Sequence, residues 1–153
     1  MRVLGISKSA GLDNLKAHLD FVKKWKVCMN DNDTRIKALK NFVGRFVKER
    51  KWERYHVPKN LSMSIAIESA ELMEVFQWLT NEQSMALKKD KKKKPEIEDE
   101  IADIAIYLLS LCNVLDVDLS KAISKKIKKN NKKYPVFTVK GRLPNHSNAE
   151  HKL

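Results

Sequence analysis

Two pairs of acidic residues in otherwise apolar stretches are the side chains best suited to do chemistry. Glu68 and Glu71 lie three residues apart, and so do Glu100 and Asp103. In an α-helix this spacing puts both members of a pair on the same face. The stretches that carry them are apolar on most sides, which predicts largely buried helices, and neither contains a lysine that would neutralise the acids.

An ionised carboxylate that is buried without a partner is strongly unfavourable, so four such groups require neutralisation. Protonation would account for one of them but is a poor answer for four. A divalent cation would satisfy all four together, and oxygen ligands without His or Cys favour Mg²⁺, Mn²⁺ or Ca²⁺ over zinc. The other interpretation places the acids at the solvent or at an oligomer interface, in ordinary ion pairs. The acidic pattern alone leaves both interpretations open.

Helices are the elements that must position these acids. The chain contains only four glycines and four prolines, which favours an all-α protein over a strand-rich one. Asn60 is the expected N-cap of the first acidic helix, and Pro95 the expected first residue of the second. Asp118 is expected to cap a basic last helix, while residues 80–94 form a mobile connection. The predicted helices cover residues 12–27, 35–52, 60–79, 95–115 and 119–132, with a polar break at 30–34.

Length and charge bound the class of protein. The chain has 153 residues, enough for one domain with a real core, and a formal charge of +12. That surplus attracts polyanions, whether nucleic acid, an anionic membrane or small phosphates, without choosing among them. Cys28 and Cys112 are too few for a disulfide framework, and Cys112 is expected in the core. No stretch is long and apolar enough to span a bilayer, so we expect a cytoplasmic protein without a membrane partner.

Four longer motifs resemble the MazG-like all-α NTP pyrophosphatases, and within them the dCTP pyrophosphatase branch. In chain order these motifs are FVKERKWERYHVPKNL, ESAELMEVFQW, EDEIADIAIYLL and DLSKAISKKIKKNNKKYP, and the resemblance covers about residues 36 to 136. It implies a four-helix core completed by oligomerisation, to a dimer or tetramer with the site shared between subunits. It also implies a Mg²⁺ cofactor, with Mn²⁺ as an alternative ion. The metal ligands and catalytic residues implied in this way are Glu68, Glu71, Glu100 and Asp103.

The same resemblance assigns further residues to the base and sugar of a nucleotide. Trp52 and Trp78 match aromatics that sandwich the base, although each is equally plausible as a core or interface aromatic. His56 and Asn60 belong to a motif that would hydrogen-bond the base or sugar, and Asn60 is just as credible as a helix cap. Tyr107 lies one turn after the acids and would bond a phosphate or orient a ligand, while a structural tyrosine is the commoner case.

A last group of residues matches the triphosphate-binding motif of the family. Lys126, Asn130 and Lys133 recur at helical spacing, and Tyr134 follows them at the end of the helix. Lysine stands at 133 where arginine is frequent, which exchanges a bidentate phosphate fork for a point charge. Ile67 and Ala70 stand where relatives often have glycine, which leaves the size of the substrate open.

The implied activity is Mg²⁺-dependent hydrolysis of a nucleoside triphosphate to its monophosphate and pyrophosphate, as in cleansing of the nucleotide pool. The expected substrate is dCTP or a related or modified pyrimidine deoxynucleotide. The alternative is a basic helical nucleic-acid-binding or oligomerisation protein without catalysis, but acids in apolar helices argue against nucleic acid as a partner. The expected domains are an N-terminal extension with a helix (1–35), the pyrophosphohydrolase domain (36–136) and a loose tail (137–153).

Overall fold

The computed structural model describes residues 29–141, and the chain divides into two compact units, Met1–Arg35 and Ile36–Leu153. The helix predicted at 12–27 and most of the C-terminal tail lie outside the described residues. In the first unit, the predicted polar break is a turn in which the Asn30 side-chain oxygen accepts hydrogen bonds from the backbone N–H groups of Asn32 and Asp33. No strand occurs between residues 29 and 141, which confirms the all-α prediction.

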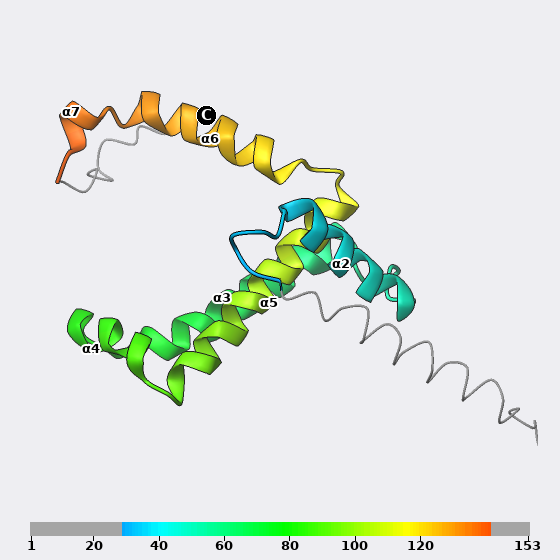
Figure 1. Ribbon diagram of the computed structural model, residues 1–153, viewed down its shortest axis with the longest axis horizontal. Helices are drawn as coiled ribbons and strands as arrows, with labels where there is room; N and C mark the ends of the chain where they lie inside the picture. Colours follow the sequence, from blue (N-terminus) through cyan, green and yellow to red (C-terminus); the bar gives the residue numbers. More distant parts are fainter. Residues whose placement is uncertain (1–28, 142–153) are drawn as a thin grey trace, which may run out of the picture. The chain divides into compact units, whose positions relative to one another are not determined.

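The second unit consists of helices joined by short connections (Figure 1). Within the described part of the chain, none of these helices is long and apolar enough to cross a membrane. The elements are α2 (Ile36–Glu49), α3 (Pro58–Phe76), α4 (Asn81–Ala86), the 3-10 helix η1 (Leu87–Lys89), α5 (Lys93–Val114), α6 (Leu119–Lys133) and α7 (Val136–Val139).

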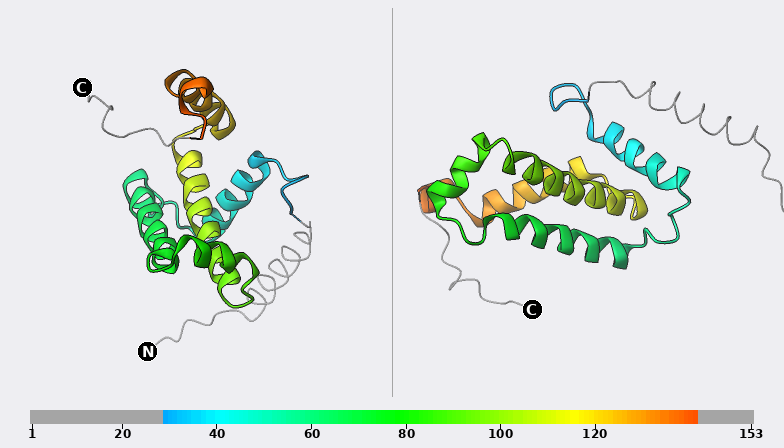
Figure 2. Two further views of the ribbon diagram at one scale, coloured as in Figure 1. Left: turned by 90° about the vertical axis from the view of Figure 1, so that its left-hand side faces the viewer. Right: turned by 90° about the horizontal axis from the view of Figure 1, so that it is seen from below.

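The structural centre of this unit is the pair formed by α3 and α5, which pack along each other, with α2 against α5 (Figures 1 and 2). The buried apolar side chains come from all three helices: Val43, Val47, Leu61, Leu109 and Cys112. Cys112 is thus a core residue, as predicted. Two long-range hydrogen bonds also join α2 to the end of α5 and to the connection after it: Asn113 Nδ2 donates to the Lys40 carbonyl and Lys40 Nζ donates to the Val117 carbonyl, both at 2.8 Å.

Helix ends follow the sequence in some places and depart from it in others. Asp118 caps α6, because its side chain accepts a hydrogen bond from the Lys121 backbone N–H at 3.0 Å. The prediction that Asn60 caps α3 was wrong. The helix begins at Pro58, a favoured first helical residue, and Asn60 Nδ2 donates instead to the Tyr55 carbonyl at 3.0 Å. Pro95 is not the first residue of α5, which begins two residues earlier at Lys93.

The prediction of a mobile connection at 80–94 is also wrong, since this segment contains α4 and η1. Thr80 and Gln83 form a capping box in which each side chain accepts from the other residue's backbone N–H. This reciprocal pair satisfies two donors that a helix start leaves open, so even a helix of six residues is held at its N-terminus.

The expectation that the acidic helices are largely buried does not hold for the single chain. Leu61 is the one buried residue of α3, whereas Met63, Ile67 and Met73 are each more than half exposed, and so is Ile101 of α5. An apolar helix face needs another surface to cover it, and the described helices of one chain do not supply one here.

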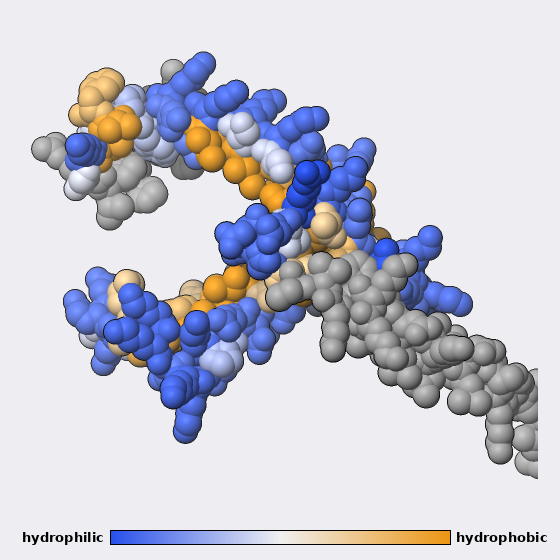
Figure 3. Space-filling model, in the orientation of Figure 1, coloured by the Kyte–Doolittle hydropathy of each residue, from blue (hydrophilic) through white to orange (hydrophobic). Residues whose placement is uncertain are grey.

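The basic helix α6 packs closely along none of the other described helices. Its apolar side carries Ile123 and Ile127, which are 45% and 53% exposed. Figure 3 shows apolar surface on one side of α6 and on the uncovered parts of α3 and α5. Both α6 and the α3–α5 pair therefore present apolar surface to solvent.

Candidate active site

Three carboxylates from two helices converge in the α3–α5 pair. Glu68 and Glu71 lie one turn apart on α3, and Glu100 lies on α5, with one oxygen of each within 4.8 Å of the others. Glu68 and Glu100 are half-buried and Glu71 is exposed. The packing of α3 along α5 thus brings both acidic motifs of the sequence to one place.

Asp103, the fourth predicted ligand, lies one turn beyond Glu100 on α5. It is exposed and does not belong to the tight group of three. Its charge nevertheless raises the pKa of both Glu68 and Glu100, so it lies within electrostatic range of the group.

The acids disfavour one another's ionisation. Desolvation is the largest cause that raises the pKa of Glu68, followed by the charges of Glu71, Asp103 and Glu100. The pKa of Glu100 is raised by desolvation first, then by Glu71, Asp103 and Asp99. A cation placed among these oxygens would reverse this balance, because it favours the ionised form of every neighbour.

The donor set fits a hard divalent cation. Glu100 Oε2 is buried and has no hydrogen-bond partner among the described residues, which is costly for a carboxylate oxygen unless it faces a cation. None of the three ion pairs in the described part of the chain involves Glu68, Glu71 or Glu100. Carboxylate oxygens without nitrogen or sulfur ligands suit Mg²⁺ and Mn²⁺ better than zinc.

An aromatic row runs beside the acids, from α2 through the α2–α3 connection to α5. The Trp52 ring lies edge-on to Phe46, with 5.9 Å between centroids, and nearly parallel to His56 at 6.4 Å. His56 is in turn 6.4 Å from the ring of Tyr107, which stands one turn after Asp103. Three of the predicted substrate residues, Trp52, His56 and Tyr107, are therefore neighbours, and Tyr107 lies on the same helix as Glu100 and Asp103.

Other predicted substrate residues lie apart from this row. Trp78 follows the end of α3 and is 86% exposed, without a ring contact to any described residue. Asn60 is exposed, and its side-chain amide is engaged with the Tyr55 carbonyl. One chain therefore does not place Trp52 and Trp78 on two sides of a common space.

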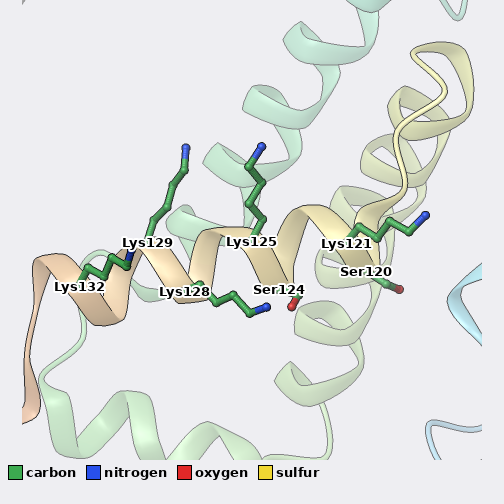
Figure 4. Close-up of a pocket in the computed structure, with 7 residues that line it drawn as sticks. All are labelled: Ser120, Lys121, Ser124, Lys125, Lys128, Lys129 and Lys132. Carbon is green, nitrogen blue, oxygen red and sulfur yellow. The ribbon is translucent and has the colours of Figure 1, made fainter.

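The predicted triphosphate residues Lys126, Asn130 and Lys133 occupy one sector of α6, and Tyr134 follows the last of them. Asn130 is half-buried, and the ammonium group of Lys133 lies 5.2 Å from the ring centre of Tyr134. Five other lysines of α6 form a separate basic face together with Ser120 and Ser124 (Figure 4). Because α6 packs closely along neither α3 nor α5, one chain does not bring its lysines against the carboxylates.

Comparison with known proteins identifies the family. The sequence model of the MazG-like family matches residues 63–142, more than half of the chain, and includes both acidic motifs and α6. The chain belongs to the MazG-like family.

Individual relatives agree with this membership of the MazG-like family. The dCTP pyrophosphatase 1 of Bos taurus is 30% identical over 116 residues, which cover 76% of this chain and 69% of the bovine protein. That of Rattus norvegicus is 31% identical over 106 residues, 69% of this chain and 62% of the rat protein. Among solved structures, a pyrophosphatase from Archaeoglobus fulgidus matches with a TM-score of 0.61 and 40% identity, over 70% of this chain and 98% of that chain.

Sequence reasoning missed one polar residue beside the aromatic row of this MazG-like chain. Ser110 lies one turn after Tyr107 and is only 3% exposed. Its signal was present in the sequence, as the one hydroxyl in the apolar run from Leu108 to Cys112. The hydroxyl of a lone serine in such a run either donates a hydrogen bond to a backbone carbonyl of its own helix or lacks a partner within the protein.

Proposed function

We propose that this chain is a Mg²⁺-dependent nucleoside triphosphate pyrophosphohydrolase that converts dCTP, or a related or modified pyrimidine deoxynucleotide, to the monophosphate and pyrophosphate. The reaction class, hydrolysis of a nucleotide to release pyrophosphate, rests on the MazG-like family match, the dCTP pyrophosphatase relatives and the pyrophosphatase structure. Mg²⁺, the preferred base and the residue roles are the further content of the proposal.

The observation that carries the proposal is the group of Glu68, Glu71 and Glu100, with oxygens within 4.8 Å of one another. Three like charges at this separation repel one another, and no lysine or arginine of the described residues forms an ion pair with them. This repulsion, without a basic partner to offset it, favours the binding of a cation among the three carboxylates. Together with Asp103, these residues would hold the metal.

The chemistry divides among the residues of the site. A divalent cation held by these residues would supply positive charge that stabilises the phosphoryl oxygens and lowers the pKa of the attacking water. The four acids would hold it from two helices, and a carboxylate that is not fully engaged with the ion would accept the proton of the attacking water. Trp52, His56 and Tyr107 form the side on which the base and sugar would lie.

The other end of the nucleotide requires α6. Lys126, Asn130 and Lys133 offer two ammonium groups and an amide, donors that suit the β- and γ-phosphates of the substrate. We propose that a second copy of the chain completes the site, in a dimer or tetramer. Support comes from the uncovered apolar faces of α3 and α5 and from Trp78, which is exposed in the single chain.

The proposal is tested by incubating the protein with a panel of canonical and modified NTPs and dNTPs, with Mg²⁺ or with EDTA. Monophosphate and pyrophosphate are followed by chromatography. Glu71→Gln should abolish activity, while Glu74→Gln, which removes the same charge one turn along α3 outside the acidic group, should retain it. Cleavage to the diphosphate and phosphate, or activity that persists in EDTA, would sink the proposal.

A further inference from the structure

A small cavity lies between α2, the α2–α3 connection and α5, with His56 of the aromatic row in its wall. Its volume is about 210 Å³, and its walls include Gly44 and Val47 of α2, Glu53 and His56 of the connection, and Ser110 and Asn113 of α5. Drug-sized ligands fill pockets of roughly 300–1,000 Å³, so this one suits a single ring.

Two polar atoms of the cavity wall have no hydrogen-bond partner within the described residues: Ser110 Oγ and His56 Nδ1. Ser110 is 97% buried, since its exposed fraction is 3%. A helical serine normally satisfies its hydroxyl on a carbonyl of the preceding turn. Ser69 of α3 does so, with its Oγ 2.6 Å from the Ile65 carbonyl, whereas Ser110 does not. A buried hydroxyl left open in this way can bond a water molecule or a ligand that enters the cavity.

The cavity lies in register with the acidic group. Ser110 comes seven residues after Asp103 on α5, which is two helical turns and therefore the same face. The rise between them is about 10 Å. Tyr107 stands between the two, and His56 lies against Tyr107. A nucleotide with its α-phosphate at the acids would extend its base toward this cavity.

The remaining polar side chains of the wall indicate which edge of a base would bind. Asn113 donates one of its two amide N–H groups to the Lys40 carbonyl, so its second N–H and its Oδ1 can still bond a ligand. The Glu53 carboxylate is an acceptor only, while a serine hydroxyl donates and accepts. This set can pair with the amino group and ring nitrogen of cytosine or with the ring N–H and carbonyl of uracil, so the place of the Ser110 hydroxyl along the edge of the base would decide between them.

We propose that this cavity is a pyrimidine subsite in which the Ser110 hydroxyl bonds the polar edge of the base and determines which pyrimidine is cleaved. This inference rests on the proposed function and adds a specificity-determining residue to it. Ser110 takes no part in metal binding or water attack, so its removal should change the ranking of substrates rather than abolish hydrolysis.

The test compares Ser110→Ala and Ser110→Cys with the native protein on dCTP, dUTP and dTTP, by kcat/KM. Alanine deletes the hydroxyl, and cysteine keeps the size of the side chain with a much weaker donor. Both variants should shift the ratio of kcat/KM for dCTP to that for dUTP by roughly tenfold, which is the effect of one hydrogen bond in a dry site. Ser69→Ala removes a hydroxyl that is already satisfied on α3 and should leave the ratio unchanged. The melting temperature of Ser110→Ala should equal or exceed that of the native protein, because an unsatisfied buried group is removed.

The failures of the two proposals are distinguishable. If the native protein cleaves dNTPs but the dCTP/dUTP ratio is the same in Ser110→Ala, the subsite is wrong and the proposed function stands. A loss that is equal for all three nucleotides, together with a lower melting temperature, assigns Ser110 a structural role and also overturns the subsite. If the native protein releases pyrophosphate from no nucleotide, both proposals fall.

Discussion

Replacing Glu71 by glutamine should make the metal-free protein more resistant to heat and at the same time remove its response to Mg²⁺. The reason is that Glu71 is the exposed member of a group whose three carboxylates lie within 4.8 Å of one another. Without an ion the group repels itself, and one neutral amide relieves that repulsion. With an ion the same substitution removes a ligand.

The size of the effect follows from the separation. Two unit charges 4.8 Å apart repel by about 0.9 kcal/mol in the dielectric of water, and salt reduces this value. Relief of the Glu68–Glu71 repulsion is therefore worth on the order of 1 kcal/mol, or about 4 °C in melting temperature for a domain of this size. In the opposite direction, free Mg²⁺ at ten times its Kd stabilises the native protein by about 1.4 kcal/mol.

Calorimetric unfolding of both proteins in EDTA and in excess Mg²⁺ measures the two effects together. Glu71→Gln should melt higher than the native protein in EDTA and lower in Mg²⁺. Glu74→Gln is the matched control, since it loses a carboxylate from the same helix outside the acidic group. Mg²⁺ should raise its melting temperature by as much as it raises that of the native protein. If Mg²⁺ does not stabilise the native protein, or if Glu71→Gln melts lower than it in EDTA, the carboxylates are not a metal site.

Three further outcomes are expected. In EDTA, the free energy of unfolding of the native protein should fall as pH rises from about 4.5 through the raised pKa values of Glu68 and Glu100. The reason is that the folded state holds these protons more tightly than the unfolded state does. Urea unfolding across this pH range measures the free energy. Lys126→Ala should raise KM for the triphosphate several-fold, whereas Lys125→Ala, on the separate basic face of α6, should change it little at physiological salt; steady-state kinetics would contradict the assignment if the two behaved alike. Ile67→Glu, at a position 54% exposed on α3, should reduce the mass measured by light scattering to that of one chain, and an unchanged mass would place the interface elsewhere.

Local chemistry decided which parts of the fold could be predicted. Periodicity located the helices, and the Asp118 cap follows from a side chain that bonds its own neighbour's backbone. The capping box of Thr80 and Gln83 was equally local, but the lysines that follow it suggested a mobile connection. Asn60 was expected to cap α3, but the helix begins two residues earlier at Pro58, because proline is favoured in the first turn. The first error came from weighing composition above capping, and the second from giving a possible cap residue more weight than the proline that precedes it.

In the candidate site, too, the local features could be predicted from the sequence and the tertiary ones could not. Spacing along one helix pairs Glu68 with Glu71, and Glu100 with Asp103, but it does not give the distance between the pairs. That distance depends on how α3 packs along α5, which is a tertiary property. The pattern also did not reveal that Ser110 lacks a partner, because whether a hydroxyl is satisfied depends on what the surrounding helices offer it.

Burial is where the single chain and the sequence pattern disagree, and the disagreement bears on mechanism. Ile67 and Ile101 are more than half exposed and stand next to Glu68 and Glu100 in the sequence. A second copy that covered these isoleucines would remove water from beside the carboxylates, which raises the free energy of their charged forms without a cation and strengthens their attraction to one. Association and metal binding would then be coupled, because the ion stabilises the assembled state more than the single chain. Such a protein would bind the metal with full affinity only after two copies had brought their substrate-binding surfaces together.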